Sequence, residues 1–284
     1  NFIIDMLYLS KNKLEYELSG QNIKHRLVRN TDRLRSVLAA YSYDVIIFYN
    51  SKKVYDTISD LKVSQRISSR VVEIYHSNFR WSDAIANHTN RVGVDNIYKV
   101  SDGLVKNVTG VDEKNKILMP VGIDTDSFIR RDGDRLRGEL GLRKKTVFGM
   151  VSRLSPEKNI KYALDLVKDL EKISLVVIGS GPREALLKQY VKEKNIDNVL
   201  FLGYKDNVYD FYNIFDAFLL TSKMEGTPIS ILEAMSCGLP IYSTDVGEIR
   251  DNFAHLEGFS LLTGDTEADR DIISAQADLP NYIQ

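Results

Sequence analysis

The chain has a single cysteine, Cys237, among its 284 residues. One thiol excludes an intrachain disulfide and any metal cluster built on cysteine ligands. Because Cys237 follows an apolar helical segment, we expect a buried structural thiol rather than a nucleophile. This sparing use of cysteine is typical of a protein from a reducing cytoplasm.

The chain also has no excess of charge of one sign. Its 38 Lys and Arg residues and 39 Asp and Glu residues give a net charge of −1. The chain therefore carries no global signal for nucleic acid or for strong attraction to a membrane. No apolar run reaches the roughly 20 residues that a membrane-spanning helix needs. The apolar opening, residues 1–10, lacks a basic leader and a cleavage site, so it predicts a strand rather than a signal peptide.

Motifs for metal binding and for hydrolytic nucleophiles are missing from the sequence. It contains no HExxH, no Gly-x-Ser-x-Gly elbow and no histidine pair at metal-ligand spacing. Asp124 and Asp126 match the sequence pattern of a metal-binding carboxylate pair, but their position before a charged segment favours a turn or capping role. Internal repeats and low-complexity tracts are absent too.

What the sequence does have is a regular alternation of strands and helices. Val/Ile/Leu runs without polar alternation predict parallel strands that are covered on both faces. The predicted strands are Phe2–Leu9, Val45–Tyr49, Val71–Tyr75, Ile97–Val100, Lys116–Met119, Val147–Val151, Leu175–Ile178, Val199–Phe201, Ala217–Thr221 and Ile241–Ser243. The clearest predicted helix is Pro156–Leu170, which has one apolar face. The alternation predicts an α/β fold with a parallel sheet.

A charged stretch separates two such α/β blocks. Residues 130–145 are rich in Arg, Lys, Asp and Glu and predict a solvated linker with a short helix. We expect an N-terminal domain over 1–127, a linker over 128–145 and a C-terminal domain over 146–284. Two α/β units side by side would offer a cleft at the carboxyl ends of their strands, where ligands of such sheets bind.

The stretch 222–240, SKMEGTPISILEAMSCGLP, puts two carboxylates around the start of a predicted helix. Thr227 is a suitable N-cap and Pro228 suits the first helical position. Glu225 would then lie in the loop before the helix, and Glu233 on the helix itself. Because a helix start favours an anion, the segment could hold a ligand that is part sugar and part phosphate. Solvated charges near a helix start are the alternative.

Two basic side chains, Arg153 and Lys158, lie around the start of the predicted helix 156–170. A cation there opposes the helix dipole unless an anion joins it, and a diphosphate would supply that charge. A plain surface pair is the alternative. Gly179 and Gly181, in the sequence GSGP, connect a strand to a helix and let the backbone approach a ligand closely. A simple strand–helix connection explains them equally well.

Two further features have both a functional and a structural interpretation. His76 follows a buried strand and could hydrogen-bond a hydroxyl in the cleft, or it could be a structural histidine at a strand end. Basic and apolar residues interleave over 24–35. This segment could rest on an anionic membrane face, although a solvated helix with its apolar side in the core is favoured.

In their order along the chain, these segments resemble the retaining, nucleotide-sugar-dependent glycosyltransferases of the glycogen-synthase-like group, glycosyltransferase family four. The matching pieces include YHSN around His76, VSRLSPEKN at 151–159, VIGSGP at 177–182 and EGTPISILEAMSCGLPI at 225–241. The resemblance implies the GT-B fold, in which two Rossmann-like lobes face a cleft. The family's first strand and glycine-rich loop have no counterpart here, which implies an N-terminal lobe that lacks its first unit.

The resemblance also implies which residues act. The implied catalytic residues touch the sugar and the leaving phosphate: His76, Arg153, Lys158 and Glu225. The implied donor-binding residues surround the nucleotide: Gly179, Gly181, Tyr204, Lys205, Gly226, Thr227, Pro228, Ile229 and Glu233. Within these sets, Arg153 and Lys158 would hold the diphosphate, Glu233 would accept hydrogen bonds from the ribose, and the loop 203–205 would border the base.

The implied reaction transfers a sugar, with retention, from a UDP- or GDP-sugar to a glycan or lipid-linked acceptor. The basic pair and the helix dipole would stabilise the leaving group, so no metal and no cofactor are expected. The implied setting is bacterial surface-polysaccharide synthesis in the cytoplasm, with peripheral contact to the inner membrane face and no nucleic acid partner. A GT-B-type nucleotide-sugar epimerase and a non-catalytic nucleotide- or carbohydrate-binding module are the alternatives.

Overall fold

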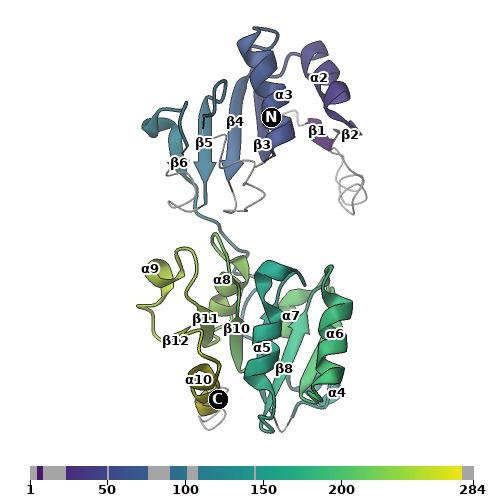
Figure 1. Ribbon diagram of the computed structural model, residues 1–284, viewed down its shortest axis with the longest axis vertical. Helices are drawn as coiled ribbons and strands as arrows, with labels where there is room; N and C mark the ends of the chain where they lie inside the picture. The colour runs from purple at the N-terminus through teal and green to yellow at the C-terminus, as the bar shows by residue number, and fades with distance from the viewer. Residues whose placement is uncertain are drawn as a thin grey trace. The chain divides into compact units, whose positions relative to one another are not determined.

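The computed structural model describes residues 5–8, 24–49, 51–75, 90–100, 108–143 and 145–276. The chain divides into two compact units, Asn1–Pro120 and Val121–Gln284 (Figure 1). In each unit the paired strands run parallel, which confirms the predicted α/β class. The division falls between Pro120 and Val121, ahead of the linker that was expected over 128–145.

The N-terminal unit contains a four-stranded sheet in the order β3-β4-β5-β6 and a separate two-stranded sheet, β1-β2. Its strands are β1 (Asp5–Tyr8), β2 (Lys24–Leu27), β3 (Val45–Tyr49), β4 (Arg70–Tyr75), β5 (Asn96–Lys99) and β6 (Lys116–Leu118). Its described α-helices are α2 (Thr31–Ala40) and α3 (Lys52–Val63). Five of the predicted strands therefore form here, and β2 was not predicted.

Strand β3 lies at an edge of its sheet and is covered on one face only. Ile46 and Phe48 are buried, whereas Val45, Ile47 and Tyr49 on the other face are exposed. The expectation that the strands are covered on both faces is therefore wrong for β3.

The basic segment 24–35 does not form one amphipathic helix. It comprises strand β2, a turn, and the start of α2, whose N-cap Asn30 accepts a hydrogen bond from the Arg33 N–H at 2.8 Å. The left-handed backbone of Arg29, with a φ of 36°, breaks the segment between the two elements. Its basic side chains therefore do not share one helix face. The solvated helix that was favoured for this segment does not form over 24–35, and neither does a single basic helix that could rest on a membrane.

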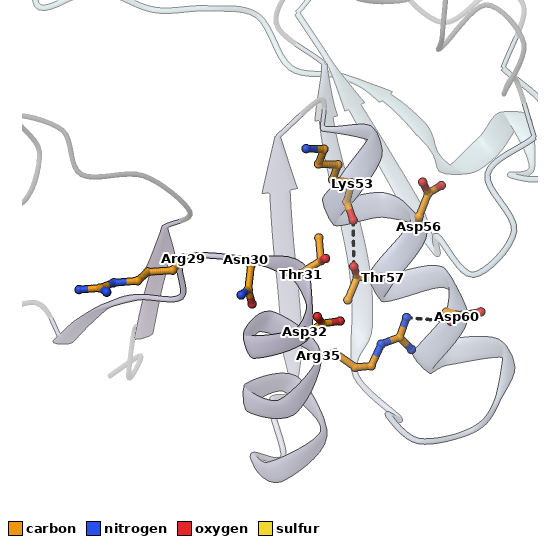
Figure 2. Close-up of a pocket in the computed structure, with 9 residues that line it drawn as sticks. All are labelled: Arg29, Asn30, Thr31, Asp32, Arg35, Lys53, Asp56, Thr57 and Asp60. Carbon is orange, nitrogen blue, oxygen red and sulfur yellow. Dashed lines mark hydrogen bonds and ion pairs between the residues drawn. The ribbon is translucent and has the colours of Figure 1, made fainter.

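A cavity of about 720 Å³ lies between α2 and α3 (Figure 2). Three basic and three acidic side chains line it, with Asn30, Thr31 and Thr57 between them. Arg35 forms an ion pair with Asp60 across the cavity at 2.9 Å. Because the positive and negative charges balance, the cavity favours neither an anion nor a cation.

The C-terminal unit is a doubly wound sheet of six strands in the order β12-β11-β10-β7-β8-β9. The strands are β7 (Thr146–Val151), β8 (Ile173–Ile178), β9 (Val199–Gly203), β10 (Ala217–Leu220), β11 (Ile241–Thr244) and β12 (Phe259–Leu262). The helices are α4 (Asp134–Glu139), α5 (Ile160–Val167), α6 (Glu184–Glu193), α7 (Val208–Tyr212), α8 (Ile229–Ser236), α9 (Ile249–Phe253) and α10 (Thr266–Gln276). Strand β12 was not predicted.

Two apolar cores cover the two faces of this sheet. On β8, Leu175 and Val177 point into the core shared with α5, α6 and α10, while Val176 and Ile178 point into the core shared with α7, α8 and α9. All six residues of β8 are buried. A continuous apolar strand is stable only when helices cover both of its faces, as they do here.

The charged segment 128–145 packs on the C-terminal unit instead of forming a solvated linker. The guanidinium of Arg137, on α4, forms a bidentate ion pair with Asp216 at 2.9 and 2.7 Å, and both side chains are buried. Nearby, the Arg131 N–H donates to the Asn213 side chain at 2.6 Å. The many charged residues of this segment predicted that its side chains are exposed to solvent. Arg137 is buried instead, and its charge is paired with that of Asp216, 79 residues away in the sequence.

Candidate functional site

The winding of the C-terminal sheet brings two predicted site segments together. Strand β7 continues to β8 and β9 on one side, whereas β10 returns to the other side of β7. The loops that follow β7 and β10 therefore leave the same edge of the sheet next to each other. This is the switch point at which open α/β sheets bind ligands.

The first of these loops carries Arg153 and Lys158. After β7, residues Pro156–Lys158 form a single 3₁₀ turn, and Asn159 adopts a left-handed conformation with a φ of 48°. Helix α5 begins only at Ile160 and ends at Val167. The prediction that Lys158 lies in the first turn of a helix 156–170 is therefore wrong, because Asn159 separates it from that helix.

Lys158 and Glu225 are in direct contact. The Lys158 Nζ lies 2.6 Å from Glu225 Oε1, although 67 residues separate the two in the sequence. The hydroxyl of buried Ser222 donates to the same carboxylate oxygen at 2.5 Å. Two hydrogen bonds therefore fix Oε1 of Glu225. A second anion that came close to the Lys158 ammonium could compete with Glu225 for it.

Backbone and hydroxyl contacts fix the two loops to each other. The Lys223 N–H donates to the Glu157 carbonyl at 2.7 Å. The hydroxyl of Thr221 lies 3.2 Å from the carbonyls of both Lys158 and Asn159. The loops that carry Lys158 and Glu225 are therefore hydrogen-bonded to each other. These bonds help to fix the geometry of the ion pair, which does not depend on its two long side chains alone.

The glycines after β8 lie against the loop that carries Arg153. Gly179 has a φ of 130°, and a Cβ there would lie 1.9 Å from the Ser152 carbonyl oxygen. A Cβ on Gly181 would lie 2.4 Å from the Leu154 carbonyl oxygen. Both positions require glycine because another backbone passes so close. That close neighbour is the loop after β7.

Helix α8 starts one residue later than predicted. Pro228 has a ψ of 106°, so it is the N-cap, and Ile229 is the first helical residue. The prediction that Thr227 is the N-cap is therefore wrong. The Pro228 side chain makes no capping hydrogen bond, and the Ile231 N–H donates to the Pro228 carbonyl at 3.1 Å. The positive end of the helix dipole at this position favours an anion.

The second carboxylate, Glu233, has a different partner. The hydroxyl of Tyr212, at the end of α7, donates to Glu233 Oε2 at 2.5 Å. Burial raises the pKa of Glu233, and the hydrogen bond from Tyr212 offsets part of that rise. Among the described residues, no hydrogen bond joins Glu233 to Glu225 or Lys158, so the two carboxylates belong to separate clusters.

Three further predicted site residues lie in more open positions. The side chain of Arg153 is exposed. Tyr204 is 57% exposed, and the Lys205 Nζ lies 5.6 Å from the centre of the Phe211 ring. Beside them, the Gly203 carbonyl accepts the Gly179 N–H at 2.8 Å. The loop after β9 is therefore joined by its backbone to the glycine loop after β8.

The loop after β7 also shifts the pKa of one of its own carboxyl groups. Burial opposes ionisation of Glu157, but the hydrogen bond from Ser155 and the charges of Lys158 and Arg153 together lower its pKa. The two basic side chains therefore act on the same region of space. A positive potential of this kind favours an incoming anion.

His76 lies outside the described residues. Across the ranges that the structure does describe, no group of three or more His, Cys, Asp or Glu side chains could hold a metal ion. In the same ranges, no helix is long and apolar enough to cross a membrane.

Sequence reasoning missed the hydroxyls that hold the two carboxylates. Ser222 precedes Glu225 by three residues, and this spacing was the available signal. Tyr212 lies on another helix, 21 residues before Glu233, where no local pattern connects them. Gly247 was missed as well: its φ is 62°, and a Cβ there would lie 2.6 Å from the Glu225 carbonyl oxygen.

The fold has counterparts among solved structures. A crystal structure of Anabaena Alr3699/HepE in complex with UDP and glucose matches 96% of this chain and 82% of that chain, with a TM-score of 0.82 and 19% sequence identity. The apo form of the lipopolysaccharide outer core galactosyltransferase WaaB matches with a TM-score of 0.66 and 20% identity. These matches identify the fold as that of the GT-B glycosyltransferases.

Sequence comparison gives the family. The model of the family "Glycosyl transferases group 1" matches residues 132–276, just over half of the chain, so this protein belongs to the group 1 glycosyl transferases. It is 32% identical over 198 residues to N-acetyl-alpha-D-glucosaminyl L-malate synthase of Bacillus anthracis, covering 65% of this chain and 51% of the relative.

A second relative is the UDP-Gal:alpha-D-GlcNAc-diphosphoundecaprenol alpha-1,3-galactosyltransferase of Escherichia coli. It is 33% identical over 147 residues, covering 48% of this chain and 38% of the relative. The chain therefore spans about half, or less, of the length of these curated relatives.

Proposed function

We propose that this protein is a retaining glycosyltransferase that moves a sugar from a nucleoside-diphosphate sugar to a glycan or lipid-linked acceptor in surface-polysaccharide synthesis. The observation that carries the proposal is the Lys158–Glu225 pair at the switch point between β7 and β10, in the loop that leads to the start of α8. A cation, a carboxylate and a helix start at one sheet edge suit a ligand with both phosphate and hydroxyl groups.

In the proposed reaction, Arg153 and Lys158 bind the donor diphosphate and stabilise the charge that develops on the leaving group. Lys158 forms an ion pair with Glu225, and in this proposal its ammonium also contacts the donor phosphate. Glu225 then accepts hydrogen bonds from the transferred sugar, assisted by the backbone of 226–229. Stabilising charge where it forms in the transition state is the largest contribution that such a site can make.

The nucleoside end of the donor is assigned to Glu233 and to the loop 203–205. A carboxylate can accept a hydrogen bond from each of two neighbouring hydroxyls, which is the pattern that a ribose presents. The positive charges near the diphosphate replace a metal ion in this proposal. His76, the remaining proposed catalytic residue, is assigned to a sugar hydroxyl from sequence resemblance alone.

The relatives support the donor and acceptor classes. The Escherichia coli relative is named for a UDP-linked galactose and a diphosphoundecaprenol-linked acceptor, and another relative is the O-antigen biosynthesis glycosyltransferase WbnH of Escherichia coli. A nucleotide-sugar donor and an acceptor on a lipid carrier or a growing glycan therefore fit the family. The acceptor side of the proposal rests on these relatives.

Thermal shift with UDP, GDP and ADP tests the proposal. At a concentration 100 times its Kd, a nucleotide should stabilise the protein by about 2.7 kcal/mol, which raises Tm by roughly 5–10 °C. Lys158→Ala should weaken binding by about 10- to 100-fold, because it removes a charge-assisted contact. Lys161→Ala is the matched control, since Lys161 forms an exposed pair with Asp165.

Three results would contradict the proposal. Failure of all three nucleotides to stabilise the wild type would exclude nucleotide-sugar binding. Equal affinities for the Lys158 and Lys161 variants would refute the site. Loss of nucleotide binding in EDTA, restored by a divalent cation, would refute the metal-free mechanism.

A further inference from the structure

The side chain of Tyr212 is completely buried at the end of α7. Its ring lies 5.5 Å from Phe128, 5.8 Å from Phe215 and 5.8 Å from Phe218, measured between ring centres. Aromatic side chains packed in this way have one preferred arrangement and little rotational freedom. The phenol oxygen is therefore held at a fixed point beside α8.

That fixed hydroxyl has one strong acceptor. It lies 2.5 Å from Glu233 Oε2, whereas the Ser230 carbonyl, at 3.4 Å, is too far away to compete. Burial and the neighbouring Glu233 charge raise the pKa of Tyr212, so the phenol stays protonated and remains a donor. The other oxygen, Glu233 Oε1, accepts no hydrogen bond from the residues that the structure describes.

We propose that Tyr212 is a positioning residue that fixes Glu233, so that Oε1 is presented to the hydroxyl groups of a nucleoside ribose. The inference rests on the proposed function, which assigns Glu233 to the ribose. A flexible glutamate loses side-chain entropy when a ligand orders it, and a carboxylate that is already anchored avoids this loss.

Simple packing is the competing explanation, because Tyr212 contributes a large ring to the core. Tyr212→Phe separates the two roles: it keeps the ring and its three aromatic neighbours and removes only the donor to Glu233. Tyr209→Phe is the matched control on the same helix. Tyr209 also has an edge contact with Phe128, with 6.5 Å between ring centres.

The experiment first identifies which of UDP, GDP and ADP binds the wild type, and then measures the Kd of that nucleotide and of inorganic pyrophosphate for each variant. Tyr212→Phe should weaken the nucleotide about tenfold, as expected for a lost hydrogen bond to a charged group. Pyrophosphate, which has no ribose, should bind with unchanged affinity. Tyr209→Phe should change neither Kd by more than about twofold.

A double-mutant cycle with Glu233→Gln completes the test. If Tyr212 acts through Glu233, Tyr212→Phe should cause little further loss of nucleotide affinity in the Glu233→Gln background. Additive losses, or equal losses for nucleotide and pyrophosphate, would show that Tyr212 is only structural. Unchanged nucleotide affinity in Tyr212→Phe would refute the positioning role alone. A wild type that binds no nucleotide would overturn the proposed function together with the inference.

Discussion

Asp216→Ala is expected to destabilise the C-terminal unit severely. The carboxylate of Asp216 accepts two hydrogen bonds from Arg137 and a third, at 2.8 Å, from the N–H of Val147 on β7. It therefore connects α4, the start of β7 and the segment before β10. The side chains of Arg137 and Asp216 are only 6% and 4% exposed, so water cannot replace the lost partner.

The size of the effect follows from this burial. Removing one partner of a buried ion pair leaves the other charge uncompensated, which costs about 3–5 kcal/mol. Arg137 keeps a hydrogen bond to the Lys145 carbonyl at 2.8 Å, so the lower part of that range is expected. Even about 3 kcal/mol is a large share of the 5–15 kcal/mol that stabilises a typical domain.

Urea denaturation followed by circular dichroism measures the loss, and hydrogen exchange of the peptides that contain β7 and β10 assigns it to the C-terminal unit. Arg135→Ala is the control, because the Arg135–Glu139 pair on the same helix is exposed and should contribute less than about 0.5 kcal/mol. A double variant with Arg137→Met should recover part of the stability, since it removes the unpaired charge. A loss below about 1 kcal/mol for Asp216→Ala would refute the reasoning.

Two further predictions concern pH and the glycine loop. Burial raises the pKa of Glu233 above the ordinary 4.5, so its carboxylate is protonated at a higher pH than usual. Nucleotide affinity, measured by calorimetry, should therefore fall on acidification before pH 4.5 is reached, and a constant affinity down to that pH would contradict the assignment. Gly179→Ala should lower the free energy of unfolding by at least about 2 kcal/mol, because its Cβ would lie 1.9 Å from the Ser152 oxygen. Gly122→Ala, with no atom within 4 Å of its Cβ, is the control, and equal stability of the two variants would argue against the close contact.

Most strands could be predicted because their signal is local. An unbroken run such as Leu175–Ile178 is explained by burial on both faces, and each strand of the C-terminal sheet except β12 was found in this way. Strand β12 was missed because Phe259–Leu262 is short and is buried at only one of its four residues. Strand β2 was missed because its basic residues resembled a helix face.

Helix boundaries were less predictable, since single backbone torsions decide them. The left-handed Asn159 divides the predicted helix 156–170, and the extended ψ of Pro228 delays α8 by one residue. Both corrections fall in the loops at the switch point, where the backbone follows the neighbouring loop and not the regular helical repeat. In these loops, contacts between segments override the local helix propensity.

The sequence by itself determined the parallel α/β class, the alternation of its elements and the residue types of the candidate site. Those properties depend on hydrophobic periodicity and on short motifs, and neighbouring residues carry both. Only the tertiary structure decided that Lys158 contacts Glu225, that Tyr212 holds Glu233 and that Asp216 buries Arg137 within an apparent linker. These partners lie 67, 21 and 79 residues apart. They meet because β10 returns to the far side of β7, and no local pattern in the sequence encodes that strand order.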